Sequence, residues 1–306
     1  MKPLLALTTI AVLALTTHQL AADSDRINTT IGTNRVSISI SGGQRLVSAN
    51  GWPDHTPGAF PRKGNPNSIS SQLYHFRIPL NPKIADTTTS MRHGLVGVAL
   101  NGVPFDPATA EFWNNDPASG WNYEARSGFI DLGLDQHNAH VQPTGAYHYH
   151  ALPIGLVQKL GGDGNRMLLV GYAADGFPIY TANGYSDSLN SKTSVRKMHS
   201  SFRLKSGIRP SGPGGNHDGK FTEDYEYVKG SGDLDECNGR FGVTPEYPQG
   251  IYHYYITDEF PYIPRQLRGT ADPSFQKARP PGGPAFSRRP PPPRSAGFIP
   301  LQRWQT

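Results

Sequence analysis

The chain has 306 residues with one cysteine, Cys237, and a formal net charge of +5. Residues 270–306 hold six of the 29 basic residues and one acidic residue, and Lys2 is a further basic residue, so residues 23–269 carry 22 basic and 23 acidic residues. This near-neutral central part lacks the basic surface of a nucleic-acid-binding protein, and a single cysteine excludes a disulfide within the chain.

The N-terminal 22 residues have the pattern of a secretory signal peptide. Lys2 supplies a positive charge, residues 4–15 form an apolar run too short to span a bilayer, and Ala21 and Ala22 offer small residues for cleavage. No later segment of the sequence is apolar enough to cross a membrane. We therefore expect residues 1–22 to be removed and the mature protein to be exported, either to the periplasm or as a secreted protein.

The elements predicted from residue 23 onward are short strands joined by turns. Val36, Ile38 and Ile40 alternate with serines, which predicts a half-buried strand. Residues 94–100 predict a buried strand that Asn101-Gly102 turns into a hairpin. The other predicted elements are strands at 73–80, 146–152, 167–172, 177–181, 225–228 and 251–257, a short helix at 154–160 and a turn at 175–176. The expected fold is mainly β, a sandwich or a barrel-like sheet with minor helix, in a single β-rich domain over residues 23–269.

The segment 270–306 is rich in proline and arginine, with four consecutive prolines at 290–293. It has too little apolar surface to offset the entropy of ordering, so we predict a disordered or polyproline-like tail. Its basic residues would allow contact with an anionic envelope polymer or a glycan. The alternative interpretation is a solvated spacer with no specific partner.

Two segments of the chain repeat one pattern. Leu134-Asp135-Gln136-His137-Asn138 precedes Tyr147-His148-Tyr149-His150, and Leu234-Asp235-Glu236-Cys237-Asn238 precedes Tyr252-His253-Tyr254-Tyr255. Each copy combines a Leu-Asp-x-x-Asn loop, a glycine and an alternation of aromatic residues with histidine. The fold is therefore expected to contain an internal pseudo-repeat.

The histidines of the first copy are the strongest functional candidates. His148 and His150 are two positions apart on a predicted strand, so their imidazoles share one face and can reach the same ion. The third ligand would be His140 in the preceding loop, His253 from the second copy, or His137. Because imidazole suits zinc and copper, the sequence predicts a transition-metal site for one of these ions.

Four residues are expected to surround the ligands of this site. Asp135 and Asp235 occupy matching places and would be either ligands or groups that orient an imidazole by a hydrogen bond to its other nitrogen. Tyr147 and Tyr149 alternate with the histidines, so we expect them on the opposite face of the strand, packed with their hydroxyl groups hydrogen-bonded. If the protein is an enzyme, the ion would activate water or, with copper, handle oxygen or electrons, and one of the two aspartates would be the general base.

Other interpretations stay open. The histidines would instead form a hydrogen-bonded seam in a non-catalytic envelope or surface module that binds a glycan or a partner protein. Cys237 would be buried and inert, paired with another chain, or a ligand of a soft metal. A calcium site is a further possibility, because oxygen-rich loops suit that ion and six acids lie in a short span: Asp218, Asp224, Glu226, Asp233, Asp235 and Glu236.

Four motifs together resemble the YHYH-domain family of exported, mostly bacterial proteins, over about residues 90–270. They are Gly145–His150, Asp175–Tyr180, Gly232–Gly239 and Phe260–Tyr262. The resemblance implies a shared fold and a shared site without naming a reaction, and the motif that names the family corresponds to Tyr147–His150.

The chain departs from the family pattern at two places. The resemblance implies a second cysteine where this chain has Gln266, so that a bridge to Cys237 would be lost here. It also implies a full second motif, which this chain ends with Tyr255. A metal site confined to the second copy would then be incomplete, whereas one shared site built from His148, His150 and His253 would not.

Overall fold

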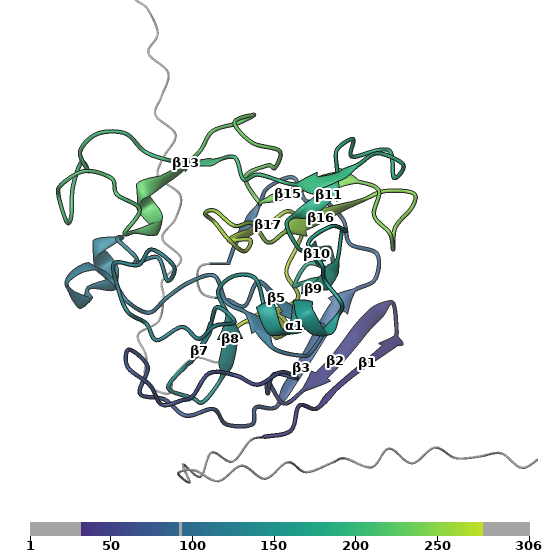
Figure 1. The fold of residues 1–306 in the computed structure, drawn as a ribbon, viewed down its shortest axis with the longest axis horizontal. Coiled ribbons are helices and arrows are strands. Elements are labelled where there is room, and N and C mark those ends of the chain that lie inside the picture. The colour runs from purple at the N-terminus through teal and green to yellow at the C-terminus, as the bar shows by residue number, and fades with distance from the viewer. Residues whose placement is uncertain (1–31, 92–93, 278–306) are drawn as a thin grey trace, which may run out of the picture. The chain divides into compact units, whose positions relative to one another are not determined.

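The computed structural model describes residues 32–91 and 94–277, and their largest element is an eight-stranded mixed sheet (Figure 1). The strand order across it is β15-β16-β10-β9-β5-β6-β8-β7. The strands are β5 (Gly97–Ala99), β6 (Pro104–Phe105), β7 (Ala139–Val141), β8 (Tyr147–Tyr149), β9 (Leu169–Ala173), β10 (Pro178–Tyr180), β15 (Gly239–Gly242) and β16 (Ile251–Tyr255). The prediction of a mainly β fold is confirmed, but this sheet is open, because its end strands β15 and β7 are not neighbours, so the barrel-like alternative is wrong.

The eight strands form two similar halves. The hairpins β5–β6 and β9–β10 pair antiparallel at the centre of the sheet, and each is flanked by a parallel neighbour, β8 or β16, that belongs to an outer hairpin. Residues 96–104 and 170–178 share the pattern Val-Gly-x-Ala-x-Asn/Asp-Gly-x-Pro, which extends the repeat noticed around the histidines. The internal pseudo-repeat is therefore present in the structure as two related halves of one sheet.

The turns of the two central hairpins explain the glycines of this pattern. Gly102 and Gly176 have φ angles of 81° and 100°, a region that glycine adopts without a steric penalty. In the first turn the Ala99 N–H donates a hydrogen bond to the Val103 carbonyl, and in the second the Ala173 N–H donates to the Phe177 carbonyl, with N···O distances of 2.9 Å in both. The hairpin predicted at Asn101-Gly102 is thus confirmed.

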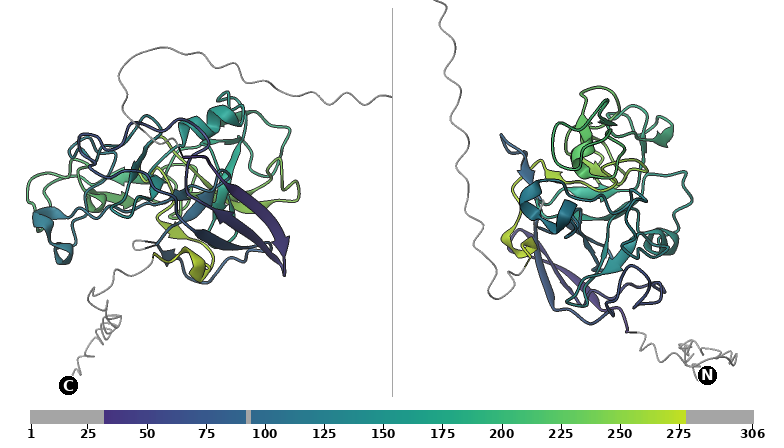
Figure 2. Two further views of the ribbon diagram at one scale, coloured as in Figure 1. Left: turned by 90° about the horizontal axis from the view of Figure 1, so that it is seen from below. Right: turned by 90° about the vertical axis from the view of Figure 1, so that its left-hand side faces the viewer.

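A three-stranded antiparallel sheet adds to the same hydrophobic core. It consists of β1 (Val36–Ser41), β2 (Gln44–Ala49) and β3 (Tyr74–Pro79), and the purple hairpin of β1 and β2 is seen from three directions in Figures 1 and 2. Val47, Phe76 and Ile78 are buried in one cluster with residues of the larger sheet. The prediction that the strand at Val36–Ile40 is half-buried is wrong, because Ile38 and Ile40 are 44% and 69% exposed on this edge strand.

The remaining elements are short. The two-stranded pairs are β4 (Thr89–Ser90) with β17 (Gln266–Leu267), β11 (Asn183–Tyr185) with β12 (Val195–Lys197), and β13 (Phe202–Leu204) with β14 (Tyr225–Tyr227). The helices are α1 (Ile154–Lys159) and the 3-10 turns η1 (Trp113–Asn115), η2 (Pro117–Ser119), η3 (Thr222–Asp224) and η4 (Pro273–Phe275). None of the helices in the described part of the chain is long and apolar enough to span a membrane.

The folded part continues past residue 269, where the sequence predicted the start of the tail. Phe275 at the end of η4 is fully buried, its ring stacks on Phe76 with centroids 4.5 Å apart, and its carbonyl accepts the N–H of Leu95 at 3.0 Å. The boundary at residue 270 was predicted from the proline and arginine content of the segment. Composition alone does not reveal that a single residue, Phe275, packs into the core. The predicted signal peptide and residues 278–306 of the predicted tail lie outside the described residues.

Candidate metal centre

The outer hairpin β7–β8 brings three histidines together. His140 on β7 is the direct antiparallel partner of His148 on β8, and His150 follows His148 by two residues, which places both on one face of the strand. The N–H of His150 donates to the carbonyl of Asn138 at 2.8 Å and so continues the ladder beyond β8. His140 was predicted in a loop; the structure places it on a strand, where its side chain faces the other two.

The three Nε2 atoms converge. The Nε2 of His150 lies 3.0 Å from that of His148 and 3.1 Å from that of His140. All three atoms lie within 4.8 Å of one another, and in residues 32–91 and 94–277 this is the one group of three or more His, Cys, Asp or Glu side chains placed to hold a metal ion. Nitrogens of a tetrahedral zinc site, bonded at 2.0–2.1 Å, stand about 3.3 Å apart, so the two distances from His150 are close to those of a bound geometry.

Backbone carbonyls fix the orientation of two of the rings. The Nδ1 atom of His140 lies 2.8 Å from the carbonyl oxygen of Leu132, and the Nδ1 atom of His148 lies 3.1 Å from that of Ala146. A carbonyl only accepts, so both Nδ1 atoms carry the proton, and in the neutral rings both Nε2 atoms present a lone pair. An imidazole oriented in this way through its other nitrogen is what a metal ligand requires.

Burial keeps the cluster neutral. His148 and His150 are 2% and 3% exposed, and His140 is partly exposed. Burial lowers the pKa of His148 and of His150 well below the usual histidine value, and the neighbouring His140 lowers both further. Burial also lowers the pKa of His140, against the opposing effect of the Leu132 carbonyl. The three imidazoles are therefore unprotonated, as metal binding requires.

The loop before β7 is held by Asp135. Its carboxylate accepts hydrogen bonds from the backbone N–H of His137 at 2.8 Å, from that of Gly58 at 2.9 Å, and from the Tyr147 hydroxyl at 2.7 Å. Asn138 then takes a left-handed conformation with φ of 59°, and its side-chain amide donates to the Leu152 carbonyl at 2.8 Å. Asp135 therefore shapes the backbone that leads to His140, and it does so through the loop rather than through an imidazole.

The tyrosines of the motif face away from the histidines, into the core. Tyr147 and Tyr149 are at most 1% exposed, and burial raises the pKa of both phenols far above the usual value. The Tyr149 hydroxyl accepts a hydrogen bond from Asn101 at 2.9 Å and lies 2.7 Å from His55 Nε2. These contacts tie the central β5–β6 hairpin to the strand that carries the histidines.

Two buried ion pairs next to the cluster were not found by sequence reasoning. Asp106, whose N–H donates to the Tyr149 carbonyl at 3.0 Å, is fully buried and lies 2.6 Å from Lys277 Nζ. Burial raises the pKa of Asp106, although Lys277 opposes this. Glu124 is likewise buried and pairs with Arg265. No local pattern marks these residues, because their partners are more than 100 positions apart.

A cavity of about 240 Å³ lies on this side of the molecule. Pro107 and Ala108, which directly follow Asp106, form part of its wall, together with Asn122, Phe260 and Arg265. Arg265 also lowers the pKa of His150 electrostatically, although its effect is smaller than those of burial and of the other two histidines. Arg265 is therefore a residue that both lines the cavity and influences the histidine cluster, while none of the three histidines lines the cavity itself.

His253 and His137 lie apart from the three clustered histidines. His253 sits on β16 in the second outer hairpin, where its Nε2 is 2.8 Å from the Tyr255 hydroxyl. His137 accepts the N–H of Gly155 at 3.0 Å through Nδ1 and contacts the Thr56 carbonyl at 2.9 Å through Nε2. Of the five histidines named as candidate ligands from the sequence, the structure thus brings His140, His148 and His150 together and places His253 and His137 elsewhere.

The acids considered for calcium contact the protein's own donors. Asp224 accepts two hydrogen bonds from Arg209 at 2.7 Å, and Asp235 accepts the Tyr252 hydroxyl at 2.9 Å. Glu236 accepts from Arg268 at 2.8 Å. A calcium ion needs several oxygen ligands gathered around one point. These acids do not provide that arrangement.

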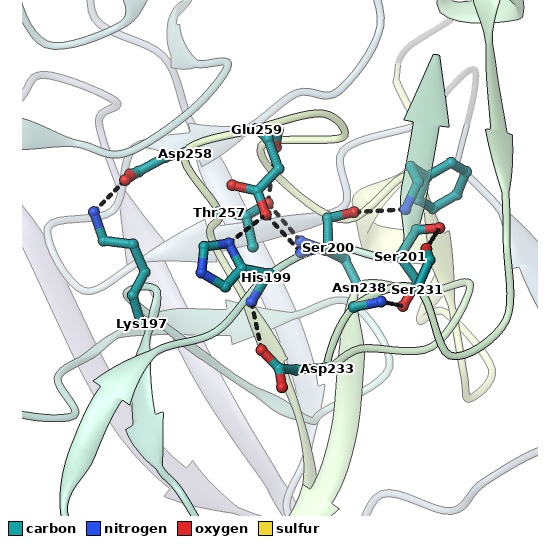
Figure 3. A network of polar contacts seen from close by, with 12 residues as sticks. Lys197, His199, Ser200, Ser201, Ser231, Asp233, Asn238, Thr257, Asp258 and Glu259 are labelled. Carbon is teal, nitrogen blue, oxygen red and sulfur yellow. Dashed lines mark hydrogen bonds and ion pairs between the residues drawn. The ribbon is translucent and has the colours of Figure 1, made fainter. Parts of the chain in front are cut away.

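Another cavity, of about 560 Å³, lies on the side of the second copy and is lined mainly by charged groups that pair with each other. Arg196 lies 2.6 Å from Asp233, and His199 Nδ1 lies 3.4 Å from Glu259. Figure 3 shows the His199 backbone N–H on Asp233 and the His199 ring next to Glu259. Because these charged side chains pair with each other, we do not expect this cavity to bind a metal ion.

Cys237 is buried, 1% exposed, at the place that His137 occupies in the first copy. Burial raises the pKa of its thiol, which keeps it protonated and unreactive. The side-chain amide of Gln266 donates to the carbonyl of the neighbouring Glu236 at 3.4 Å. Residue 266 is thus next to the cysteine loop.

Comparison with known proteins gives one family. The family model described as "YHYH protein" matches residues 75–269, a range that contains both outer hairpins and the three clustered histidines. Neither a curated protein nor a solved structure matches the sequence.

Proposed function

This chain belongs to the YHYH protein family, and we propose that it is an exported metal-binding protein that holds one zinc or copper ion on His140, His148 and His150. Export is proposed from the signal-peptide pattern of residues 1–22. The metal is proposed from the geometry of the histidine cluster.

The observation that carries the proposal is the orientation of the rings. Leu132 and Ala146 hold the Nδ1 protons of His140 and His148, so two lone pairs point at the Nε2 atom of His150. A neutral His150 ring has one proton to donate at most, so at least one close nitrogen pair in the buried cluster has no hydrogen between its atoms. A cation at the centre of the three Nε2 atoms would satisfy all of them at once.

The ligand set favours zinc or copper. All three donors are imidazole nitrogens, which suit these ions, whereas calcium and magnesium prefer oxygen. Three protein ligands also leave a fourth position for water or another small molecule, as in catalytic zinc sites.

A second candidate function rests on the same contacts. If the cluster were only a structural seam, the Nε2 contacts of His150 with His148 at 3.0 Å and with His140 at 3.1 Å would be hydrogen bonds. The second copy supports this alternative, because the Nε2 atom of His253 contacts the Tyr255 hydroxyl there. In that case the protein would be a non-catalytic binding or structural module.

Elemental analysis of the protein spanning residues 23–306, purified without added metal or chelator, tests the proposal. We expect close to one equivalent of zinc or copper per chain, lost in His148→Ala/His150→Ala. His253→Ala is the matched control, since it removes a buried histidine from the corresponding strand of the other copy and should leave the metal content unchanged. A folded, metal-free protein that fails to take up either ion would rule out the metal site and favour the seam.

A further inference from the structure

We propose that the second outer hairpin, β15–β16, is a copy of the metal site in which the guanidinium of Arg240 stands in for the ion, and that two substitutions would open it to zinc. The inference rests on the proposed metal site of the first copy. It extends that proposal to a second place in the molecule, and it explains why the wild-type chain would bind one ion and not two.

The strand register shows that the two hairpins are equivalent. His140 pairs with His148 across β7 and β8, and Arg240 pairs with His253 across β15 and β16. Tyr255 follows His253 by two residues, as His150 follows His148, and its N–H donates to Asn238 as that of His150 donates to Asn138. Arg240 and Tyr255 thus occupy the places of two ligands, and His253 occupies the place of the third.

The retained histidine is still oriented as a ligand. His253 Nδ1 lies 2.9 Å from the Ile251 carbonyl, which matches the contact of His148 with Ala146. Its Nε2 therefore presents a lone pair, and here that lone pair accepts the Tyr255 hydroxyl at 2.8 Å. Burial lowers the pKa of His253 to about 4, and Arg240 acts in the same direction, so the ring is neutral.

Arg240 brings a permanent positive charge to the place where a metal ion would lie in the second hairpin. Its Nε donates to the Tyr255 hydroxyl at 3.2 Å, and its Nη2 donates to the Tyr185 carbonyl at 2.6 Å. A guanidinium cannot lose its proton in a protein and has no lone pair to offer a metal. Arg240 therefore repels a divalent ion and also supplies the hydrogen bonds that the cluster would otherwise lack.

The framework around this position remains that of a ligand-bearing hairpin. Asp235 accepts the N–H of Cys237 at 2.9 Å and the Tyr252 hydroxyl at 2.9 Å, as Asp135 does for His137 and Tyr147. Asn238 has φ of 60°, against 59° for Asn138. The backbone that presents three histidines in the first copy is thus already built in the second.

Zinc stoichiometry in an Arg240→His/Tyr255→His variant tests the inference. The full mature chain is dialysed against zinc and the metal counted by elemental analysis, with circular dichroism to confirm folding. We expect two equivalents in the variant against one in the wild type. Adding His148→Ala/His150→Ala to it should leave one equivalent, now in the second hairpin. Tyr255→His alone should add none, because Arg240 remains.

The outcomes separate this inference from the proposed function. One equivalent in both the wild type and the folded double variant would overturn the inference and leave the first site intact. An increase from none to one would support the inference and refute the proposed site in the first copy, and none in either protein would refute both.

The reverse exchange keeps the test valid if the double variant does not fold. His140→Arg/His150→Tyr should give the first hairpin the arginine, histidine and tyrosine of the second. We expect a folded chain that binds no zinc and has a higher melting temperature than His148→Ala/His150→Ala. A His140→Arg/His150→Tyr chain that still binds zinc, or that is no more stable than the alanine variant, would show that arginine does not replace the ion.

Discussion

Mild acid should destabilise the metal-free protein through His148 and His150. Burial lowers the folded-state pKa of both, whereas in the unfolded chain they titrate near the ordinary value of 6.5. Below that value the unfolded chain binds protons that the folded chain does not. The stabilising contribution is therefore complete above about pH 6.5 and is lost as the pH falls below it.

The magnitude follows from the linkage relation. For one histidine that stays neutral in the folded state, lowering the pH from about 6.5 to 5.5 reduces the free energy of unfolding by about 1 kcal/mol. The two buried rings together should therefore account for about 2 kcal/mol over this interval. Three other histidines have a lowered pKa, His55, His140 and His253, and they add to the total but not to the difference between wild type and a variant of this pair.

Urea unfolding in the presence of a chelator, followed by tryptophan fluorescence at several pH values, measures this difference. A His148→Asn/His150→Asn variant should lose about 2 kcal/mol less than the wild type on acidification, although it is less stable at neutral pH. His75→Asn is the control, because it removes a histidine that is exposed on β3 and lies outside the cluster.

The reasoning would be refuted by equal losses of stability in the wild type and in His148→Asn/His150→Asn. That result would mean that the two rings bind protons in the folded chain as readily as in the unfolded one. Proton NMR of the ring signals provides an independent reading, since the signals of both residues should not shift between pH 7.5 and 5.5 in the folded protein, a range set by the ordinary histidine pKa of about 6.5.

Three further predictions concern the same hairpin. Zinc at about 1,000 times its dissociation constant should raise the free energy of unfolding by about 4 kcal/mol, as measured by calorimetry, and His148→Ala/His150→Ala should abolish the rise. Asp135→Asn should cost about 2 kcal/mol of stability in urea, because the buried carboxylate accepts several hydrogen bonds; unchanged zinc content would agree with its role in the loop, and lost zinc would contradict it. Asn138→Ala should be less stable than Asn138→Gly by about 1 kcal/mol in the same assay, because both lose the side-chain hydrogen bond but only alanine is strained at φ of 59°; equal stability would show that the left-handed conformation is not enforced.

The local pattern of the sequence predicted the strand β8, which carries the Tyr147–His150 motif, and the turns of the two central hairpins. Asn101-Gly102 and Asp175-Gly176 identify tight turns because glycine adopts the positive φ that such turns need without a steric penalty, and both turns are present. The alternation at Tyr147–His150 correctly separates a histidine face from a tyrosine face, since side-chain period in a strand does not depend on the rest of the fold.

The pairing partners of those strands could not be predicted. β7 is three residues long and consists of Ala139, His140 and Val141, too short for any periodicity, so His140 was assigned to a loop. Whether the sheet closes depends on pairing between β7 and β15, which are about 100 residues apart in the sequence. No local sequence pattern indicates whether two such distant strands pair. The anchoring of Lys277 on Asp106 is a long-range contact of the same kind.

The centre of the eight-stranded sheet has a consequence for the origin of the chain. β5 and β9 pair with Gly97 opposite Ala173, Val98 opposite Tyr172 and Ala99 opposite Gly171. Gly171, Tyr172 and Ala173 are the counterparts of Gly97, Val98 and Ala99, so this register is the one that a two-fold axis imposes on two identical strands. A protein containing a single half could therefore build the same sheet as a homodimer with an isologous interface. Such an ancestor would have carried two equal hairpins by symmetry, and fusion of its genes would have been the step that allowed one hairpin to keep three histidines while the other acquired an arginine.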